Sequence, residues 1–337
     1  MHAADPALGR RILIASVLVV LLPFGFIYAF VAAINHVLLP LLESFGHGPY
    51  HGRVYVSPVL AVVIVLGGLA TQVWFGPSTV LGSIGARRIT PDERPELHAA
   101  VTRLAQAADV ESPDIAVASN DAPNAAAVRG PAGASIVVTT GLLDRLDGEE
   151  LEAVLAHEIA HLKNRDATVM TVAWFLPTVT YYLALAAAYL LYGTYRALGA
   201  GSSSGRNGRG LAKAVVVLTV TAVVTIAISA LFWAASVLIH RILSRYREYA
   251  ADRGAATLTG EPAALASALR TLDEEMSEIP DRDLRKLDGG AEALYVAPLS
   301  ARSFTDAALV STDIFPDTHP QTEDRIDRLR ELAGEVE

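Results

Sequence analysis

Four apolar segments of membrane length constrain this chain more than any other feature of its sequence. Each provides about 20 or more mostly apolar residues, enough for a helix to cross a hydrocarbon core of roughly 30 Å. They cover Arg11–Leu42, which contains Pro23 and Pro40, and then Val54–Phe75, Thr168–Tyr192 and Leu211–Leu243. We therefore predict four transmembrane helices, with the first interrupted at its prolines. That first segment is too long for the apolar core of a cleaved signal peptide.

Arginine and lysine in the short flanking loops indicate how these helices are oriented, because such loops are richer in these cations on the cytoplasmic side. The first side has Arg10, Arg11, Arg87, Arg88, Lys163, Arg165, Arg241, Arg245 and Arg247, and the other has Arg53, Arg196, Arg206, Arg209 and Lys213. Both long polar stretches fall on the first side. We therefore expect one cytoplasmic domain assembled from two separate stretches of chain.

The alternation of apolar and polar segments divides the chain into four parts. Residues 1–75 hold the first two spans, and residues 76–167 form the first part of the polar domain. Residues 168–243 hold the other two spans, joined by a Gly/Ser-rich loop at 193–210, and residues 244–337 complete the polar domain.

Local patterns in the polar stretches predict a mostly helical domain with a small sheet. Asp114–Ala118 and Ser135–Thr140 are short, β-branched and bounded by Pro and Gly, so we expect strands there. Thr90, Pro91 and the acids after them are typical of a helix start, and this helix should end near Ala108. The expected fold class is α+β, with four transmembrane helices and a polar domain that is mostly α-helical with a small β-sheet.

The segment Val154–Asp166 (VLAHEIAHLKNRD) contains the pattern of a metal-binding helix, which Asp147 should cap at its N-terminus. His157 and His161 are four residues apart, so their imidazoles share one helix face and can bind the same ion. Glu158 lies beside them and can act as a base. Imidazole ligands suit zinc, whose catalytic sites keep one position open for water. This spacing also arises by chance on solvated helices, but the apolar neighbours of the motif favour a ligand role.

A third metal ligand is expected after the fourth apolar segment. No Gly-x-x-His sequence follows His161, which excludes a site with three histidines, and the chain has no cysteine to supply a thiolate. Glu248 and Asp252 are four residues apart, so both can point the same way on a helix. Glu248 can complete coordination by two His and one Glu, and Asp252 can accept the N–H of a ligating imidazole. Alternatively, the two acids are surface residues paired with Arg247 and Arg253.

Further positions are candidates for contact with a substrate. Asn124 and Ala125 lie in a stretch expected to be extended, whose backbone can bind an extended peptide, although Asn124 can equally be a turn residue. His319, in a Thr-His-Pro turn, can donate to an oxyanion or approach the zinc, or it can be a surface residue of that turn. Arg325 is a second candidate for stabilising the oxyanion.

The charge pattern excludes several other functions. The approach to the motif at 144–156 (DRLDGEELEAVLA) is too charged to lie in lipid, so the metal site belongs near the membrane surface and not inside the bilayer. The spans lack paired acids or histidines at their centres, which disfavours a zinc transporter. No basic stripe is interleaved with aromatic residues, so we expect no nucleic-acid partner.

Together, HEIAH at 157–161, SRYREYAAD at 244–252 and THPQTEDRIDRL at 318–329 resemble the HtpX family of membrane-embedded zinc metalloproteases, related to the CAAX prenyl proteases. The resemblance covers nearly the whole chain. It implies a zincin-like domain of the gluzincin type and one Zn²⁺ per chain. It also implies that His157, His161 and Glu248 are the zinc ligands and that Glu158 is the catalytic base. Asn124-Ala125 resembles the start of a family segment, Asn-Ala-Phe-Ala, that lies along the substrate, with Ala126 here in place of the aromatic residue.

The expected function is that of a membrane-bound zinc metalloendopeptidase that hydrolyses peptide bonds of misfolded or damaged membrane proteins. The resemblance alone implies the role in quality control and stress. We expect a multi-pass protein of a prokaryotic plasma membrane, with the lipid bilayer and membrane-protein or unfolded polypeptide substrates as partners. One alternative is a CAAX prenyl-protein endopeptidase, whose relatives have a larger membrane chamber. Another is a zinc-binding membrane chaperone or scaffold without catalysis, in which Glu158 would have no use.

Overall fold

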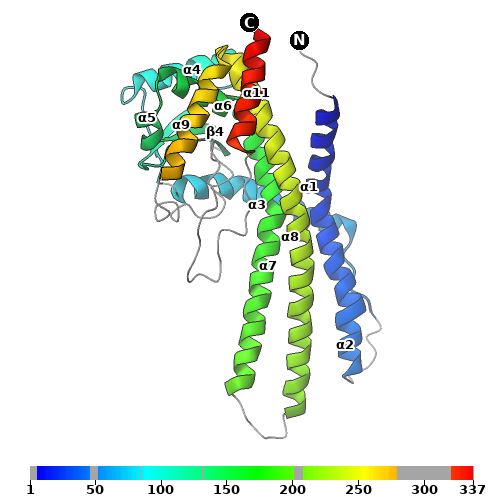
Figure 1. Cartoon of the computed structure of the whole chain (residues 1–337). Coiled ribbons are helices and arrows are strands. Elements are labelled where there is room, and N and C mark those ends of the chain that lie inside the picture. Colours follow the sequence, from blue (N-terminus) through cyan, green and yellow to red (C-terminus); the bar gives the residue numbers. More distant parts are fainter. Residues whose placement is uncertain are drawn as a thin grey trace. The chain divides into compact units, whose positions relative to one another are not determined.

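The structure is a computed structural model that describes residues 6–45, 52–83, 85–130, 133–200, 208–278 and 320–336 (Figure 1). The chain forms two compact units. Unit 1 comprises Met1–Ile12, Thr71–Val172 and His240–Glu337, and unit 2 comprises Leu13–Ala70 and Ala173–Ile239. Each unit is thus assembled from stretches that are far apart in the sequence.

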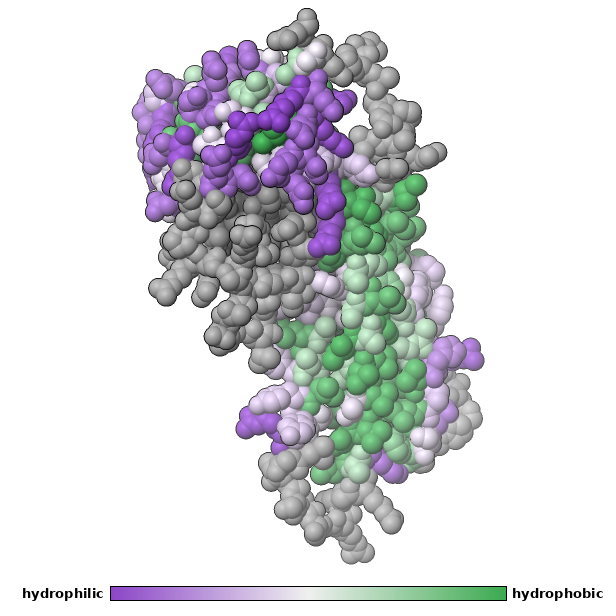
Figure 2. Space-filling view, viewed as in Figure 1, coloured by the Kyte–Doolittle hydropathy of each residue, from purple (hydrophilic) through white to green (hydrophobic). Residues whose placement is uncertain are grey.

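Unit 2 consists of long helices that are apolar on their exposed sides. The elements that contribute to it are α1 (Pro6–Ala33), the π-helical turn η1 (Ile34–Leu38), α2 (Leu39–Ser44), α3 (Pro58–Ser83), α7 (Asp166–Ala200) and α8 (Gly208–Thr259). Val59, Leu66 and Leu231 are among its exposed side chains, and Figure 2 shows hydrophobic residues gathered along these helices. Among the described residues, four segments are long and apolar enough to cross a membrane: Ile14–Ser44, Pro58–Phe75, Thr168–Arg196 and Gly210–Thr259. The prediction of four spans is confirmed.

The prolines of the first span interrupt its helix less than the sequence predicts. α1 continues through Pro23 without interruption, because neighbouring groups and small backbone adjustments in a membrane helix can satisfy the carbonyl that proline leaves free. Pro40 lies in the first turn of α2, directly after the π-helical turn, whose Leu39 N–H donates to the Ile34 carbonyl. The predicted interruption is therefore wrong at Pro23, and at Pro40 it is limited to a local change in helix type.

Unit 1 contains a small mixed sheet. Its strands are β1 (Arg87–Arg88), β2 (Asp114–Ala118), β3 (Ala125–Gly130) and β4 (Gly133–Thr139), in the order β1-β2-β4-β3. β2 and β4 are parallel, and the other neighbours are antiparallel. The two predicted strands correspond to β2 and β4, and the stretch expected to be extended begins β3. Within the described residues, β3 is an edge strand.

Helices cover this sheet and complete the core of unit 1. They are α4 (Pro95–Ala108), α5 (Thr140–Arg145), α6 (Gly148–Asn164), α9 (Pro262–Glu278) and α11 (Thr322–Val336), together with the nearby ends of α7 and α8. One buried cluster joins Leu104, Ile115, Leu155, Leu269 and Leu329, which come from α4, β2, α6, α9 and α11. The helical domain with a small sheet and the four candidate spans confirm the predicted fold class.

The helix α4 begins later than the sequence predicts. Residues from Thr90 to Glu93 form a turn, in which the Glu93 N–H donates to the Thr90 carbonyl at 3.0 Å and the Glu93 carboxylate accepts the Thr90 N–H at 2.8 Å. Pro91 and Pro95 both suit the first turn of a helix, and the hydrogen bonds of this turn leave Pro95 to start α4. The expected end at Ala108 is confirmed.

Candidate metal centre

α6 carries the metal-binding motif and buries it. The helix begins with a capping box: the Asp147 carboxylate accepts the Glu150 N–H at 2.8 Å, and the Glu150 carboxylate accepts the Asp147 N–H at 3.4 Å, which confirms the predicted cap. His157, Glu158 and His161 are only 0%, 3% and 8% exposed. Buried polar groups of this kind need partners, because leaving them without any is costly.

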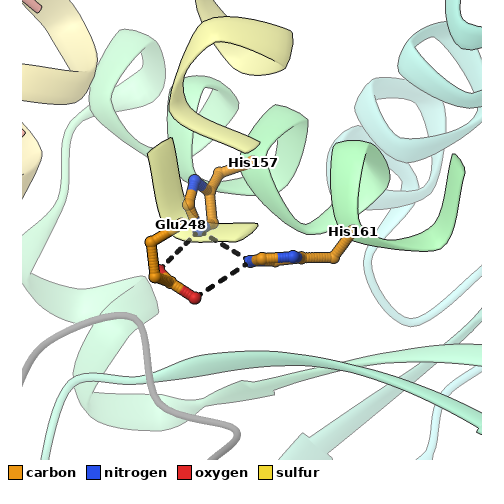
Figure 3. Close-up of side chains that lie close together, drawn as sticks. All are labelled: His157, His161 and Glu248. Atoms are coloured by element: carbon orange, nitrogen blue, oxygen red, sulfur yellow. Dashed lines mark hydrogen bonds and ion pairs between the residues drawn. The ribbon is translucent and has the colours of Figure 1, made fainter. Parts of the chain in front are cut away.

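Three donor groups converge at one point beside α6 (Figure 3). The Nε2 atoms of His157 and His161 are 3.0 Å apart, and each lies 3.5 Å from a different carboxylate oxygen of Glu248, which comes from α8. A zinc ion with ligand bonds of roughly 2.0–2.1 Å keeps tetrahedral donors about 3.3 Å apart. The donor types and their spacing therefore fit a zinc ion.

α8 reaches α6 closely at a glycine. A Cβ atom at Gly254 would lie only 2.8 Å from the Cβ of Ala160, which is inside the motif. Ala160 cannot move away by rotating its side chain, so only glycine fits this contact without a shift of one helix. The contact lies less than two turns beyond Glu248, and it lets α8 bring this carboxylate to the imidazoles.

The far side of His157 is held by a buried acid and a buried arginine. The Asp252 Oδ1 lies 3.0 Å from the His157 Nδ1. Asp252 also accepts two hydrogen bonds from Arg325 of α11, from Nε at 2.9 Å and from Nη2 at 2.6 Å. Arg325 is fully buried, and its Nη1 lies 3.5 Å from Glu248. Asp252 thus occupies the position expected of an acceptor for a ligating imidazole, and Arg325 is brought to the site through this acid.

His161 has a corresponding pair of partners that the sequence reasoning missed. Its Nδ1 lies 2.7 Å from the Oδ2 of Asp166, the first residue of α7. The other oxygen, Oδ1, lies 3.1 Å from the Nε of Arg247 on α8. Asp166 was hard to predict because it follows His161 by five residues, a spacing that does not share a face on one continuous helix. The only local signal was an acid directly after the motif.

The electrostatic surroundings of Glu158 suit proton transfer. Burial raises the pKa of its carboxyl group above the ordinary value, although both imidazoles and a hydrogen bond from the Ala127 backbone act in the opposite direction. A carboxylate whose pKa is moved toward neutrality is a better general base and acid. Because Ala127 belongs to β3, this edge strand passes next to Glu158.

The surroundings of His157 favour its protonated form when no metal is bound. Burial alone lowers the pKa of this imidazole, but the hydrogen bonds to Asp252 and Glu248 outweigh it and raise the pKa to about 9. Such a cluster of acids around one imidazole favours a bound cation.

The remaining predicted residues differ in how close they lie to this centre. Asn124 is 8% exposed and Ala125 is buried, and both lie at the start of β3, where the Asn124 N–H donates to the Thr139 hydroxyl at 2.8 Å. Ala125 thus lies on the strand that reaches Glu158, and Asn124 directly precedes it. His319, the other predicted catalytic residue, lies outside the described residues.

A buried HExxH helix, a carboxylate from a distant helix and four candidate membrane spans define a membrane metallopeptidase. Comparison with known proteins agrees. Residues 91–333 match Peptidase family M48. The chain belongs to this family.

Two relatives named as HtpX protease homologues agree with this assignment. The chain is 39% identical over 280 residues to "Protease HtpX homolog 2" of Methanosarcina acetivorans, covering 83% of this chain and 86% of the relative. It is 40% identical over 281 residues to "Protease HtpX homolog 1" of Streptomyces coelicolor, covering 83% and 84%. The crystal structure of S. mikatae Ste24p is similar with a TM-score of 0.41 and 22% identity, over 90% of this chain and 63% of that chain. The expected resemblance to HtpX is confirmed, and the protein is a membrane metalloprotease.

Proposed function

We propose that this protein is a zinc metalloendopeptidase that hydrolyses peptide bonds of misfolded or damaged membrane proteins. The observation that carries the proposal is the buried carboxylate of Glu158 next to three donors that fit one metal ion. Structural zinc sites are closed by four protein ligands, whereas the part of the chain that the structure describes offers three, His157, His161 and Glu248, which leaves one position for water or substrate. A catalyst can use an acid beside an open coordination position as a general base, whereas a scaffold has no use for such an acid.

The side chains around the site have distinct roles in the proposed reaction. A zinc ion held by His157, His161 and Glu248 supplies Lewis acidity toward a water molecule and a peptide carbonyl. Glu158 accepts a proton from the attacking water and then gives it to the departing amine, for which its raised pKa is favourable. Asp252 keeps His157 oriented with Nε2 toward the metal, and Arg325 holds Asp252 in place.

β3 is the proposed binding strand for the substrate backbone. It is an edge strand among the described residues, and the amide of Ala127 reaches the general base. A peptide that adds to such an edge binds in extended form through main-chain hydrogen bonds. Ala125 begins this strand and Asn124 directly precedes it, so the substrate would pass along them. His319 is proposed to donate to the developing oxyanion.

The proposed location is the plasma membrane of a prokaryote, with unit 1 on the cytoplasmic side. The excess of loop arginines and lysines next to the first side supports this orientation. The proposed substrates are membrane proteins or unfolded polypeptides, and one zinc ion is bound per chain.

The test is the variant Glu158→Gln in the full chain, purified in detergent. Gln keeps the shape of the side chain but cannot accept the proton, so peptidase activity should fall by at least about 100-fold while zinc remains stoichiometric. Glu149→Gln, at an exposed position of the same helix, is the matched control and should keep full activity. Normal turnover by Glu158→Gln would refute the assigned base.

Substrate choice is tested separately. The wild-type protein is given a farnesylated CAAX peptide and an unmodified unfolded membrane protein at equal concentration. Cleavage of the unmodified protein supports the proposal, and cleavage of the prenylated peptide alone would assign the chain to prenyl-protein processing instead.

A further inference from the structure

The two imidazoles of the metal centre are supported in the same way from two different directions. His157 contacts Asp252, which in turn contacts Arg325. His161 contacts Asp166, which in turn contacts Arg247. In this second chain of contacts, His161–Asp166–Arg247, the acid comes from α7 and the arginine comes from α8.

The geometry at Asp166 fits a residue that orients His161. Asp166 is 5% exposed, and its two carboxylate oxygens are both engaged, one by the imidazole at 2.7 Å and one by the guanidinium at 3.1 Å. When the Nε2 of His161 faces a metal, its Nδ1 carries the proton and donates to Asp166. This contact fixes both the tautomer and the ring orientation that a ligand needs.

A backbone feature places Asp166 there. Five residues on a continuous helix correspond to 140° from the starting side chain, so an uninterrupted α6 would point Asp166 away from His161. The chain instead has Arg165 in the left-handed conformation, with φ 57°, and α7 starts immediately after it. This conformation is unfavourable for a non-glycine residue. Because of this turn, the carboxylate faces the imidazole.

Arg247 makes the burial of Asp166 tolerable and connects it to the third ligand. A buried carboxylate without a cationic partner is strongly destabilising. The Arg247 side chain is 11% exposed and supplies that partner. It directly precedes Glu248, so the same turn of α8 provides both the third donor and the support of His161.

We infer that Asp166 and Arg247 are positioning residues of the metal centre. Asp166 orients His161, and Arg247 holds Asp166 and thereby couples the start of α7 to the turn of α8 that carries Glu248. This inference rests on the proposed metal-dependent function. Its consequence is that metal affinity depends on the ends of the two helices that continue as the third and fourth candidate spans.

The test measures zinc affinity in the purified full chain by competition with a chelator, without any activity assay. Asp166→Asn keeps the shape of the side chain but removes its charge, and it should weaken zinc binding by about 10–100-fold. The cobalt-substituted variant should show an altered visible spectrum, because the orientation of His161 changes. Asp144→Asn and Arg245→Met, at exposed positions of α5 and α8, are the matched controls and should bind zinc as the wild type does.

A double variant separates positioning from a merely structural ion pair. Asp166→Asn with Arg247→Met leaves neither charge unpaired, so thermal stability should recover relative to Asp166→Asn. Zinc affinity should stay as weak as in Asp166→Asn alone, because Arg247 acts through Asp166. Recovery of wild-type zinc affinity in the double variant, or unchanged affinity in Asp166→Asn, would overturn the inference. A failure of Glu158→Gln to lose activity would instead refute the proposed catalytic base and leave these zinc measurements unaffected.

Discussion

At the scale of single residues, protons and metal compete for the same imidazole. The acids around His157 raise its pKa from 6.5 to about 9, so the metal-free side chain is protonated at neutral pH. A metal ion must displace that proton in order to bind. Zinc binding and proton release are therefore coupled at this residue.

The apparent zinc affinity should rise with pH between about 6.5 and 8.5, by up to roughly tenfold per pH unit. The sign follows from the raised pKa of about 9: below that pH the proton occupies His157 and opposes the metal, so affinity is lost as pH falls. Chelator competition at several pH values, corrected for protonation of the chelator, measures the slope.

The matched variant for this prediction is Asp252→Asn. It removes a carboxylate that raises the pKa of His157, so its affinity should be weaker overall and should change less steeply with pH. A zinc affinity of the wild type that stays constant across this pH range would contradict the assigned protonation state.

Sequence reasoning identified most of the residues around the metal centre but not their pairing. Spacing on a helix was sufficient to place His157, Glu158 and His161 on one element, and a second helical spacing selected Glu248 and Asp252. Asp166 was not predicted because its position depends on the left-handed backbone conformation of Arg165. This conformation is uncommon for arginine, so the sequence does not indicate it. Sequence reasoning gave Arg325 a role toward the substrate, whereas the structure shows its guanidinium bound to Asp252.

At the scale of elements, the approach of α8 to α6 decides whether the three donors meet. The two helices approach closely at Gly254 and Ala160. Alanine is a better helix former than glycine by roughly 1 kcal/mol, which alone would stabilise the protein. Here the added methyl group would lie 2.8 Å from the neighbouring helix, and this overlap should outweigh the gain.

Gly254→Ala should therefore destabilise the protein by about 1–3 kcal/mol and weaken zinc binding, because α8 must move away from α6. Thermal unfolding and chelator competition measure the two effects. Gly334→Ala is the control, since a Cβ there meets no atom within 4 Å on α11, and it should stabilise slightly. If Gly254→Ala has the stability and the zinc affinity of the wild type, the role given to this contact is contradicted.

The elements themselves were largely predictable because their signals are local. The cap at Asp147 and the β-branched strands β2 and β4 formed where the sequence indicated. The start of α4 was wrong because Pro91 and Pro95 offer the same local signal, and only the hydrogen bonds of the turn choose between them. The extended stretch at Asn124 was expected, but its place at the sheet edge beside Glu158 depends on strand order, which the sequence does not encode locally.

At the scale of the whole molecule, the metal centre joins two polar stretches separated by two candidate spans. Helices that cross a membrane in sequence must return the chain to the same side after an even number of crossings. The presence of α6 and the end of α8 in one unit agrees with this rule. The orientation of that side is proposed from loop charges alone.

Cysteine labelling tests this orientation, and the native chain contains no cysteine to interfere. Ala107→Cys, on the exposed side of α4, should be protected from a membrane-impermeant maleimide in intact cells and should react after lysis. Arg53→Cys, in an exposed segment before α3, should react in intact cells. Reaction of Ala107→Cys in intact cells, with protection of Arg53→Cys, would reverse the proposed orientation.

Because α8 is continuous from Gly208 to Thr259, insertions and deletions within it affect the metal centre. A residue inserted before Glu248 would turn everything beyond it by 100° and advance it by 1.5 Å if the helix stayed intact. Either change is enough to swing the carboxylate out of reach of both imidazoles. Insertions and deletions in this helix should therefore be selected against even where individual side chains are free to vary.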